Sequence, residues 1–295
     1  MSPTIALLGH NGKVGVSVFL NLLKAHREGK IALTVLHREG SDLSKVPTDA
    51  GVETRLIDLS ETGVEKTKSA VKDADVVIST VGNAGLKAQE YLVQALVGSS
   101  KLKTFIHSDF GNNWTQAEYA AAPGLAVGIG LKEHVAAKAK ELGVPITNIR
   151  IGVLAPFFLG HKVLGTYIKE NKFQTFRNNL TNPIRLTNFD YLGYAVAYLV
   201  SDESRIAQLP GQTYQIYDVE VTGQQVIDTL TKVHGQAPEI TALAEEEFEK
   251  TLKTPLGLFA AVYAKWGSNL WGEGEKLAVG EWTPKPFEDQ VKQFI

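Results

Sequence analysis

The N-terminal stretch of this chain constrains its fold more than any other part. Thr4–Leu8 is a short apolar run of the kind that forms a buried parallel strand, and Val14–Leu23 carries apolar residues at helical spacing. Between the two runs lie Gly9, Gly12 and Gly15, which form a G-x-x-G-x-x-G pattern. The pattern predicts a strand, a glycine-rich turn and a helix, the unit that begins a doubly wound α/β sheet.

Each glycine of this pattern has its own physical role. Gly9 permits the sharp turn after the strand, Gly12 lets a pyrophosphate approach the backbone, and Gly15 lets the helix pack closely on the sheet. The helix N-terminus that follows suits an anion, because its N–H groups lack partners within the helix and its dipole is positive there. We therefore expect the loop to bind a dinucleotide; glycines that only make the turn are the alternative. The expected loop contacts also include Asn11, Lys13 and Val14.

The end of the second predicted strand bears on which dinucleotide is bound. Ala32–Leu36 is apolar and leads into His37 and Arg38, at the position where the fingerprint has its ribose-binding residue. An acidic residue there favours NAD, whereas Arg38 offers a planar cationic group to a 2′-phosphate, and Glu39 follows it without replacing it. We therefore predict NADP(H) as the cofactor. The alternative is that Arg38 is a solvated loop arginine.

The composition excludes several classes of partner and chemistry. The 295 residues have a formal net charge of −2, so no electrostatic attraction to nucleic acid or to an anionic membrane is expected. No cysteine is present, which excludes disulfides, thiolate catalysis and zinc sites built on sulfur. The seven histidines show no metal-ligand grouping, and we expect no metal.

The chain ends and apolar runs bear on location. The N-terminal residues lead straight into the first strand, and no apolar run approaches the length of a membrane span. The sequence therefore predicts no targeting peptide and a cytoplasmic location. With 44% hydrophobic residues, the chain is long enough for one large domain or for a domain with an appended lobe. A homo-oligomer is compatible with this composition.

Strand and helix patterns alternate along the chain, as in a parallel α/β sheet. After Arg38 the expected strands are Val52–Ile57, Asp75–Ser79, Lys103–His107 and Thr147–Leu154. The expected helices are Glu61–Lys72, Gln89–Val97, Leu131–Leu142, Gln224–His234 and Glu245–Leu252. Pro210–Tyr217 is expected to be a strand that returns to the main sheet.

Residues just after these strands are expected to contact the cofactor, because doubly wound sheets bind ligands beyond the carboxyl ends of their strands. Asp58 follows the third strand, where it either flanks the adenine or caps the next helix. Thr80, Val81 and Gly82 follow the fourth strand and let the backbone lie against the cofactor. Ser108 follows the fifth strand, at the sheet edge where the nicotinamide is expected.

A resemblance to a known family rests on four segments in the correct order: GHNGKVG, VLHRE, FIHSDFGNN and LKEHVAAKAKELGVPIT. They resemble the isoflavone reductase-like and NmrA-like branch of the atypical short-chain dehydrogenases. The similarity spans residues 4–160 and continues more weakly in LTNFDYLGYAVAYLVSDE and YQIYDVEVTGQQVIDTLTKVHGQ. The resemblance implies a Rossmann-type doubly wound parallel sheet with a smaller, interleaved C-terminal lobe that binds the substrate.

The resemblance also implies a proton-transfer residue. Reductases of this family place a lysine at the start of the helix that contains LKEHVAAKAKELG, and Lys132 occupies that position here. Commoner short-chain dehydrogenases have a tyrosine four residues before the lysine, but position 128 is Gly128, so a Tyr-x-x-x-Lys mechanism is absent. Tyr119 is close in sequence, yet nothing in its spacing assigns it to the site. Lys132 is the expected catalytic residue and a cofactor contact; the alternative is that it only binds the ribose hydroxyls.

Aromatic residues follow the sixth predicted strand, at the position that faces the nicotinamide and the substrate in this family's fold. The expected substrate contacts are Phe110, Phe157, Phe158 and His161. The residues expected on a lid over the substrate are Tyr167, Phe173 and Phe176. The alternative is that these aromatic side chains form core. Leu256–Trp271 either closes the substrate cleft or forms a partner surface.

These inferences divide the chain into two interleaved parts. Residues 1–154 are expected to bind NADP(H), with residues 190–218 returning to this domain, and residues 155–295 are expected to form mainly the substrate lobe. The expected function is NADPH-dependent reduction of a small aromatic or apolar acceptor, at a carbonyl, an activated alkene or a benzylic ether. A redox sensor that binds NADP(H) and acts through a protein partner is the alternative. A structural role is the third hypothesis.

Overall fold

The chain alternates between two sets of segments, and each set forms a compact unit. The computed structural model describes residues 2–295, apart from the side chains of Ala126 and Val127. The first unit consists of Met1–Phe110, Ile129–Ile149 and Leu192–Tyr214. The second unit consists of Gly111–Gly128, Arg150–Tyr191 and Gln215–Ile295. Residues 111–128, placed by the sequence in the N-terminal domain, thus belong to the second unit.

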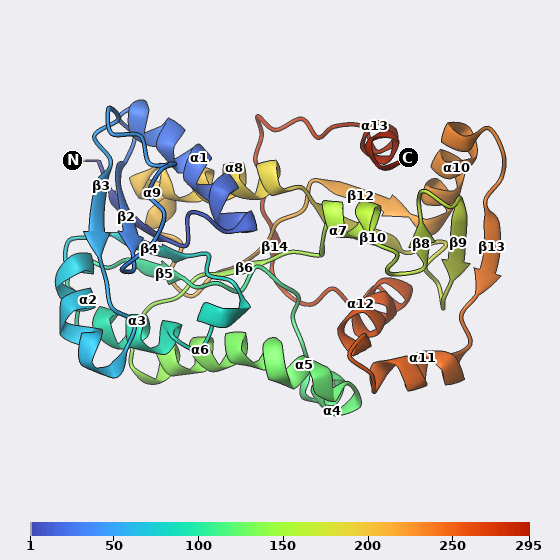
Figure 1. Ribbon diagram of the computed structural model, residues 1–295, viewed down its shortest axis with the longest axis horizontal. Helices are drawn as coiled ribbons and strands as arrows, with labels where there is room; N and C mark the ends of the chain where they lie inside the picture. Colours follow the sequence, from blue (N-terminus) through green and yellow to red (C-terminus); the bar gives the residue numbers. More distant parts are fainter. Residues whose placement is uncertain (1) are drawn as a thin grey trace. The chain divides into compact units, whose positions relative to one another are not determined.

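A five-stranded parallel sheet organises the first unit, in the order β3-β2-β1-β4-β5 (Figure 1). Its strands are β1 (Thr4–Leu8), β2 (Ala32–His37), β3 (Glu53–Leu56), β4 (Val76–Ser79) and β5 (Thr104–Ile106). β1 pairs with β2 on one side and with β4 on the other, so the strand order reverses beside β1. This arrangement confirms the predicted doubly wound α/β class, in which ligands bind at the reversal.

Helices cover both faces of this sheet (Figure 1). On one face lie α1 (Lys13–Arg27) and α8 (Phe189–Val200), and on the other lie α2 (Val64–Val71), α3 (Gln89–Leu96) and α6 (Gly130–Glu141). Shorter helices are η1 (Glu61–Gly63), η2 (Asn83–Gly85) and α9 (Glu203–Ile206). α8 packs closely on α1, because a Cβ at Gly193 would lie 2.3 Å from Oγ of Ser17.

Both faces of β1 are buried. Ala6 and Leu8 belong to a buried cluster with side chains of α2, α3 and α6. Ile5 and Leu7 alternate with them along the strand, point to the opposite face and are 0% exposed. A strand buried on both faces needs apolar residues at consecutive positions, which explains the continuous apolar run at the start of the sequence.

The predicted sixth strand, Thr147–Leu154, is interrupted. It forms β6 (Asn148–Arg150) and β7 (Val153–Leu154), which belong to different sheets. At Gly152, between them, a Cβ would lie 2.1 Å from a carbonyl oxygen of β10 (Pro183–Thr187). The chain therefore approaches β10 closely at this glycine, and β7 then pairs with β10 in parallel.

The strand predicted within Pro210–Tyr217 also pairs differently from the prediction. β11 (Thr213–Gln215) lies between β6 and β14 (Glu275–Lys276) in a three-stranded sheet. The prediction that it joins the main sheet is wrong, because β11 pairs with β6, and the segment before β6 meets β5 only in an isolated bridge between Ile146 and Phe105. The bonds from the Gly211 N–H to the Ile146 carbonyl, at 2.8 Å, and from the Asn148 N–H to the Gln212 carbonyl, at 2.9 Å, precede this pairing.

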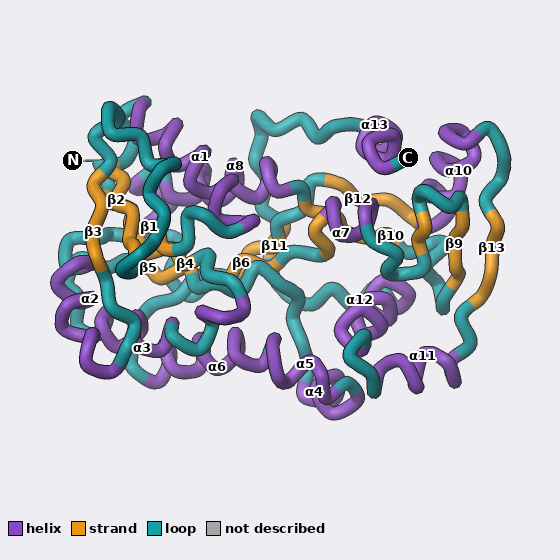
Figure 2. The backbone as a smooth tube through the Cα atoms, in the orientation of Figure 1, coloured by secondary structure: helices purple, strands orange, loops and turns teal. Residues whose placement is uncertain are grey.

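The second unit combines two further three-stranded sheets with short helices (Figure 2). The sheet β12-β10-β7 adds β12 (Val219–Thr222), and the other sheet consists of β13 (Glu239–Ala242), β9 (Lys172–Thr175) and β8 (Thr166–Tyr167). The helices are α4 (Gln116–Ala121), α5 (Pro123–Gly128), α7 (Ala155–Gly160), α10 (Gly223–His234), α11 (Glu245–Leu252), α12 (Gly257–Ser268), α13 (Phe287–Val291) and η3 (Lys292–Phe294). Within residues 2–295, none of the helices has the length and apolar character needed to span a membrane.

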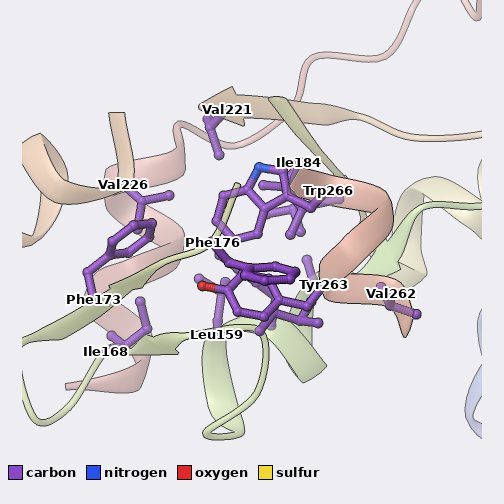
Figure 3. Close-up of a cluster of buried hydrophobic side chains, with 14 of the residues drawn as sticks. Leu159, Ile168, Phe173, Phe176, Ile184, Val221, Val226, Val262, Tyr263 and Trp266 are labelled. Carbon is purple, nitrogen blue, oxygen red and sulfur yellow. The ribbon is translucent and has the colours of Figure 1, made fainter. Parts of the chain in front are cut away.

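Aromatic side chains fill the core of the second unit (Figure 3). Trp266 of α12 is 0% exposed, and its ring lies edge-on to Phe158 and Phe173 at centroid distances of 5.9 and 6.0 Å. Phe176 packs on Tyr263 at 5.2 Å. The prediction that Phe173 and Phe176 lie on a lid is therefore wrong, because both are core residues. α12 belongs to the same core, which neither alternative for Leu256–Trp271 foresaw; a helix that is apolar on most sides is usually buried.

Candidate functional site

The carboxyl ends of β1, β2 and β4 border a groove in the first unit. It lies beside the reversal of strand order, where doubly wound folds bind ligands, and has a volume of about 370 Å³. Its lining residues are Leu8, Gly9, His10, Asn11, Gly12, Leu36, His37, Arg38, Ser41, Leu59, Thr80, Val81, Gly82, Asn83, Ala84 and Gly85. The structure therefore brings together the glycine-rich turn, Arg38 and the residues after β4, as the sequence predicts.

The glycine-rich turn forms one wall of the groove. Gly9 has a φ of +93°, and a Cβ there would lie 2.8 Å from Thr80. A Cβ at Gly15 would lie 1.9 Å from the carbonyl oxygen of Gly9. At Gly12, in contrast, the nearest atoms would be 3.4 Å away, which is an ordinary contact. The fold itself therefore requires glycine at positions 9 and 15, whereas the protein atoms around Gly12 would tolerate a Cβ.

The N-terminus of α1 follows directly on this turn. Gly12 is its N-cap residue, and its first turn carries no acidic side chain. Lys13 and Val14 lie in that first turn, and Lys13 is exposed. The N–H groups of a first helical turn have no acceptor inside the helix and lie at the positive end of its dipole. This end of the groove therefore suits a phosphate group.

Arg38 lies just beyond β2, exposed at the rim of the groove. It also borders a neighbouring polar hollow of about 620 Å³, together with Asp58 and Lys66. Its backbone is held by reciprocal bonds, because the Arg38 N–H donates to Oγ of Ser41 and the Ser41 N–H donates to the Arg38 carbonyl, both at 3.1 Å. Lys66 is a second cation that sequence reasoning missed, since only folding brings α2 beside the residues after β2.

Asp58 follows β3 and borders the same hollow. Its side chain packs against Gly63, where a Cβ would lie 2.3 Å from Cγ of Asp58. The N-cap residues of η1 and α2 are Ser60 and Gly63. The alternative that Asp58 caps the next helix is therefore wrong, and a contact with adenine stays a prediction.

Two hydroxyl groups hold the strand ends around the groove. Oγ1 of Thr80 donates to the Leu8 carbonyl at 2.9 Å, and Oγ of Ser108 donates to the Val81 carbonyl at 2.7 Å. A Cβ at Gly82 would meet nothing within 4 Å, so the backbone is open there. Thr80, Val81 and Gly82 line the groove, whereas Ser108 acts on its wall through Val81.

His10 lines the groove but was not identified from the sequence, because it occupies a variable position of the glycine pattern. It is 3% exposed, and its ring lies edge-on to Phe19 of α1 at a centroid distance of 5.8 Å. Burial lowers the pKa of the imidazole, with a further contribution from the positive charge of Lys45, and outweighs the bond with the Asp42 backbone, which raises it. His10 is therefore neutral at pH 7.

Lys132 lies in the first turn of α6, and its Nζ donates a hydrogen bond to the carbonyl oxygen of Asp109. Asp109 is buried after β5, and the next residue, Phe110, has a φ of +41°, a strained conformation for a side chain of this size. Lys132 is thus held beyond the end of β5. Lys132, Ser108 and Phe110 are not among the residues that line the groove, so their contacts with cofactor and substrate stay predictions.

The remaining predicted substrate contacts lie on α7 and at its end, in the second unit. Phe158 is 0% exposed and packs on Trp266, so its prediction as a substrate contact is wrong: no surface of its ring is available to a ligand. Phe157 is half-buried and stacks on exposed His161, with 5.2 Å between ring centroids. Substrate contacts of Phe157 and His161 stay predictions.

A doubly wound sheet with a glycine-rich groove at its switch point defines the class of Rossmann-type nucleotide-binding proteins. Within that class, the sequence matches the NmrA-like family over residues 1–265. The chain therefore belongs to the NmrA-like family.

Curated relatives and solved structures agree with this assignment. The chain is 32% identical over 95 residues to phenylcoumaran benzylic ether reductase POP1 of Populus trichocarpa, an alignment that spans 32% of this chain and only 30% of that protein. It is 25% identical over 263 residues to an isoflavone reductase homolog of Lupinus albus, covering 84% and 81% of the two chains. The crystal structure of an isoflavone reductase matches with a TM-score of 0.74 at 16% identity, covering 100% of both chains. The structure of the leucoanthocyanidin reductase–NADPH complex from Vitis vinifera matches with a TM-score of 0.75 at 17% identity, covering 99% of both chains. These structural matches show a shared fold.

Proposed function

We propose that this chain is an NADP(H)-dependent reductase that acts on a small aromatic or otherwise apolar acceptor. The observation that carries the proposal is the groove at the switch point, with the glycine-rich turn as one wall and Arg38 at its rim. An aromatic acceptor is supported by the relatives, which are named a phenylcoumaran benzylic ether reductase and an isoflavone reductase homolog.

The residues of the groove fit NADP(H). Gly12, which has no side chain beside the groove, and the N-terminus of α1 suit the diphosphate, and the planar guanidinium of Arg38 suits a 2′-phosphate. Val81 and Gly82 also line the groove. When bound, the nicotinamide supplies the hydride; the chain binds the phosphates, fixes the orientation of the rings and handles the proton.

Lys132 is the residue to which we assign proton transfer. An ammonium group carries three N–H donors, and the bond to the Asp109 carbonyl fixes this one beyond the end of β5. A proton held at Nζ is taken up by an acceptor that binds there while it is reduced. If Lys132 instead only binds ribose hydroxyls, it affects cofactor affinity and not the chemical step.

A second candidate is a sensor that binds NADP(H) and signals to a protein partner. One observation bears on it: Lys132, the residue to which we assign proton transfer, is not among the residues that line the groove. Both candidates use the same groove, and they differ in whether an acceptor is turned over.

The proposal is tested by NADPH consumption with a panel of phenylpropanoid, quinone and enone acceptors. We expect Lys132→Met to lower the turnover number by roughly 10²-fold, the usual effect of removing a positioned acid–base group, with a much smaller change in NADPH affinity. The matched control is Lys138→Met, because Lys138 lies on the same helix and pairs with Glu141 at 2.8 Å, away from Asp109. Weaker NADPH binding with unchanged turnover would assign Lys132 to the ribose. Tight NADPH binding by the wild type without turnover of any acceptor would favour the sensor.

A further inference from the structure

One backbone carbonyl, that of Asp42, joins the glycine-rich turn to the segment that follows β2. Nδ2 of Asn11 donates to it at 2.6 Å, and Nε2 of His10 lies 3.1 Å from it. A carbonyl oxygen accepts two hydrogen bonds through its two lone pairs, so these two side chains saturate it. Because a carbonyl cannot donate, Nε2 of His10 carries the proton in this bond.

The segment fastened in this way is itself tightly turned, and it carries Arg38. Arg38 and Ser41 exchange their two reciprocal bonds at 3.1 Å, and the Ser44 N–H donates to Oδ1 of Asp42 at 2.8 Å. Residues 38–44 are therefore two linked turns in which Asp42 lies next to Ser41. A displacement of the Asp42 carbonyl moves Ser41, and with it the backbone of Arg38.

The two anchoring side chains come from neighbouring positions of the wall on which we expect the diphosphate to bind. His10 is buried against Phe19, which restricts its ring to one orientation. Asn11 is exposed, but its bond is the shorter of the two. The backbone from which the Arg38 side chain extends is thus fastened to the wall of the diphosphate site before any ligand arrives.

We infer that His10 and Asn11 are positioning residues for cofactor selectivity, which fasten residues 38–44 to the glycine-rich turn so that Arg38 meets the 2′-phosphate. The inference rests on the proposed function in one respect, namely that Arg38 reads the 2′-phosphate. Binding to an ordered loop avoids the entropy cost of ordering it, so the effect appears in affinity for ligands that carry this phosphate.

The test measures binding of adenosine 2′,5′-bisphosphate and of 5′-AMP to the full chain by calorimetry. These probes differ only in the 2′-phosphate and contain no nicotinamide. We expect Asn11→Ala and His10→Leu each to lower the ratio of bisphosphate affinity to 5′-AMP affinity by about tenfold, the equivalent of one lost hydrogen bond. His10→Gln keeps an N–H donor within reach of the carbonyl and is expected to recover most of the loss. Asn21→Ala is the control, because Nδ2 of Asn21 also donates to a backbone carbonyl, that of Ser17 at 3.0 Å, but within α1.

Limited digestion with trypsin gives a second readout that does not depend on any ligand. Arg38 and Lys45 flank the fastened segment and are both exposed. We expect faster cleavage after these residues in Asn11→Ala than in the wild type or in Asn21→Ala. Equal losses for both nucleotides in Asn11→Ala, or unchanged cleavage, would overturn the inference. If the wild-type protein binds the two nucleotides with equal affinity, the proposed role of Arg38 itself is contradicted. If the wild type prefers the bisphosphate and the variants keep that preference, only the positioning role of His10 and Asn11 is contradicted.

Discussion

At Arg38, the charge of a single side chain is expected to decide between two cofactors. Arg38→Ala should weaken NADPH binding by about 2 kcal/mol, the usual range for a hydrogen bond to a charged group, and leave NADH binding almost unchanged. Fluorescence titration with NADPH and with NADH measures the ratio of the two affinities. Arg27→Ala is the control, since Arg27 is also exposed but lies in the last turn of α1 and not at the groove. An unchanged ratio in Arg38→Ala would show that another group selects the cofactor.

Gly12 and Gly15 are expected to respond differently to the same added methyl group. A Cβ at Gly12 meets protein atoms only at 3.4 Å, so Gly12→Ala should fold normally and lose affinity for NADPH and NADH alike. A Cβ at Gly15 overlaps the Gly9 carbonyl oxygen at 1.9 Å, so Gly15→Ala should destabilise the fold by more than about 2 kcal/mol. Calorimetric titration and urea unfolding separate the two effects.

The control for these glycine variants is Gly280→Ala, whose Cβ would meet nothing within 4 Å. We expect no change in stability or binding there. Tight binding of either cofactor by a folded Gly12→Ala protein would contradict the assignment of the diphosphate to this turn.

Residues that act on their immediate neighbours were predictable from the sequence, and residues that act across the fold were not. Gly9 and Gly15 control a turn and a helix start within six residues of one another, so their spacing alone indicates their roles. The bonds from His10 and Asn11 reach a residue more than thirty positions away. Both bonds are accepted by the backbone carbonyl of Asp42. Because every residue type has such a carbonyl, the sequence at position 42 gives no indication of these bonds.

At the level of helices, α4 and α12 are joined by a partly buried ion pair within the second unit. Lys265 of α12 is only 4% exposed and pairs with Glu118 of α4, and its Nζ also lies 4.5 Å from the ring centre of Trp114. Glu118 is also the N3 residue of a capping box with Thr115. Partial burial opposes ionisation of Glu118, but the hydrogen bonds from Lys265 and Thr115 outweigh it, so the pKa of Glu118 is lowered.

We expect Glu118→Gln to destabilise the protein by about 2 kcal/mol at pH 7, because it leaves the buried Lys265 ammonium without its counter-charge while glutamine still completes a capping box. A carboxylate with a lowered folded-state pKa stabilises the fold above its unfolded pKa, and this contribution is lost as the pH falls through the folded value. The difference between wild type and variant should therefore shrink on acidification below the ordinary glutamate pKa of about 4.3.

Urea unfolding at pH 7 and at acidic pH measures this dependence. Glu246→Gln is the matched control, because Glu246 pairs with Lys250 at 2.7 Å on the surface of α11, where both side chains are largely exposed. An exposed pair of this kind contributes little to stability, so the control should behave as wild type at both pH values. A difference between wild type and Glu118→Gln that does not depend on pH would contradict the ion-pair assignment.

Elements with a strong local pattern were predicted within a few residues, and those defined by distant partners were not. The helix predicted over Glu245–Leu252 is observed with those bounds. The interruption of Thr147–Leu154 was missed because its cause, the close approach of Gly152 to β10, lies about thirty residues further along the chain. For Phe158, the sequence could not show whether the side chain lines a binding site or lies in the core, since both environments favour apolar aromatic residues.

In the molecule as a whole, the two units are tied together by the path of the chain. Six segments alternate between them, so the chain passes from one unit to the other five times. Neither unit is a continuous stretch, and unfolding of one releases the ends of segments that belong to the other. The four tryptophans, Trp114, Trp266, Trp271 and Trp282, all belong to the second unit, whereas the groove belongs to the first. Tryptophan fluorescence therefore reports on the unit that does not contain the groove.

This separation allows the coupling between the units to be measured. A ligand at 100 times its Kd stabilises the folded state to which it binds by about 2.7 kcal/mol. Because the chain crosses between the units five times, we expect both units to unfold together. NADP+ at 100 times its Kd should then raise the free energy of unfolding in urea by about 2.7 kcal/mol, whether unfolding is followed by tryptophan fluorescence or by circular dichroism. Gly12→Ala, which is expected to fold but not to bind, is the control and should show no shift. If NADP+ moves the circular dichroism transition but leaves the tryptophan transition unchanged, the two units unfold independently.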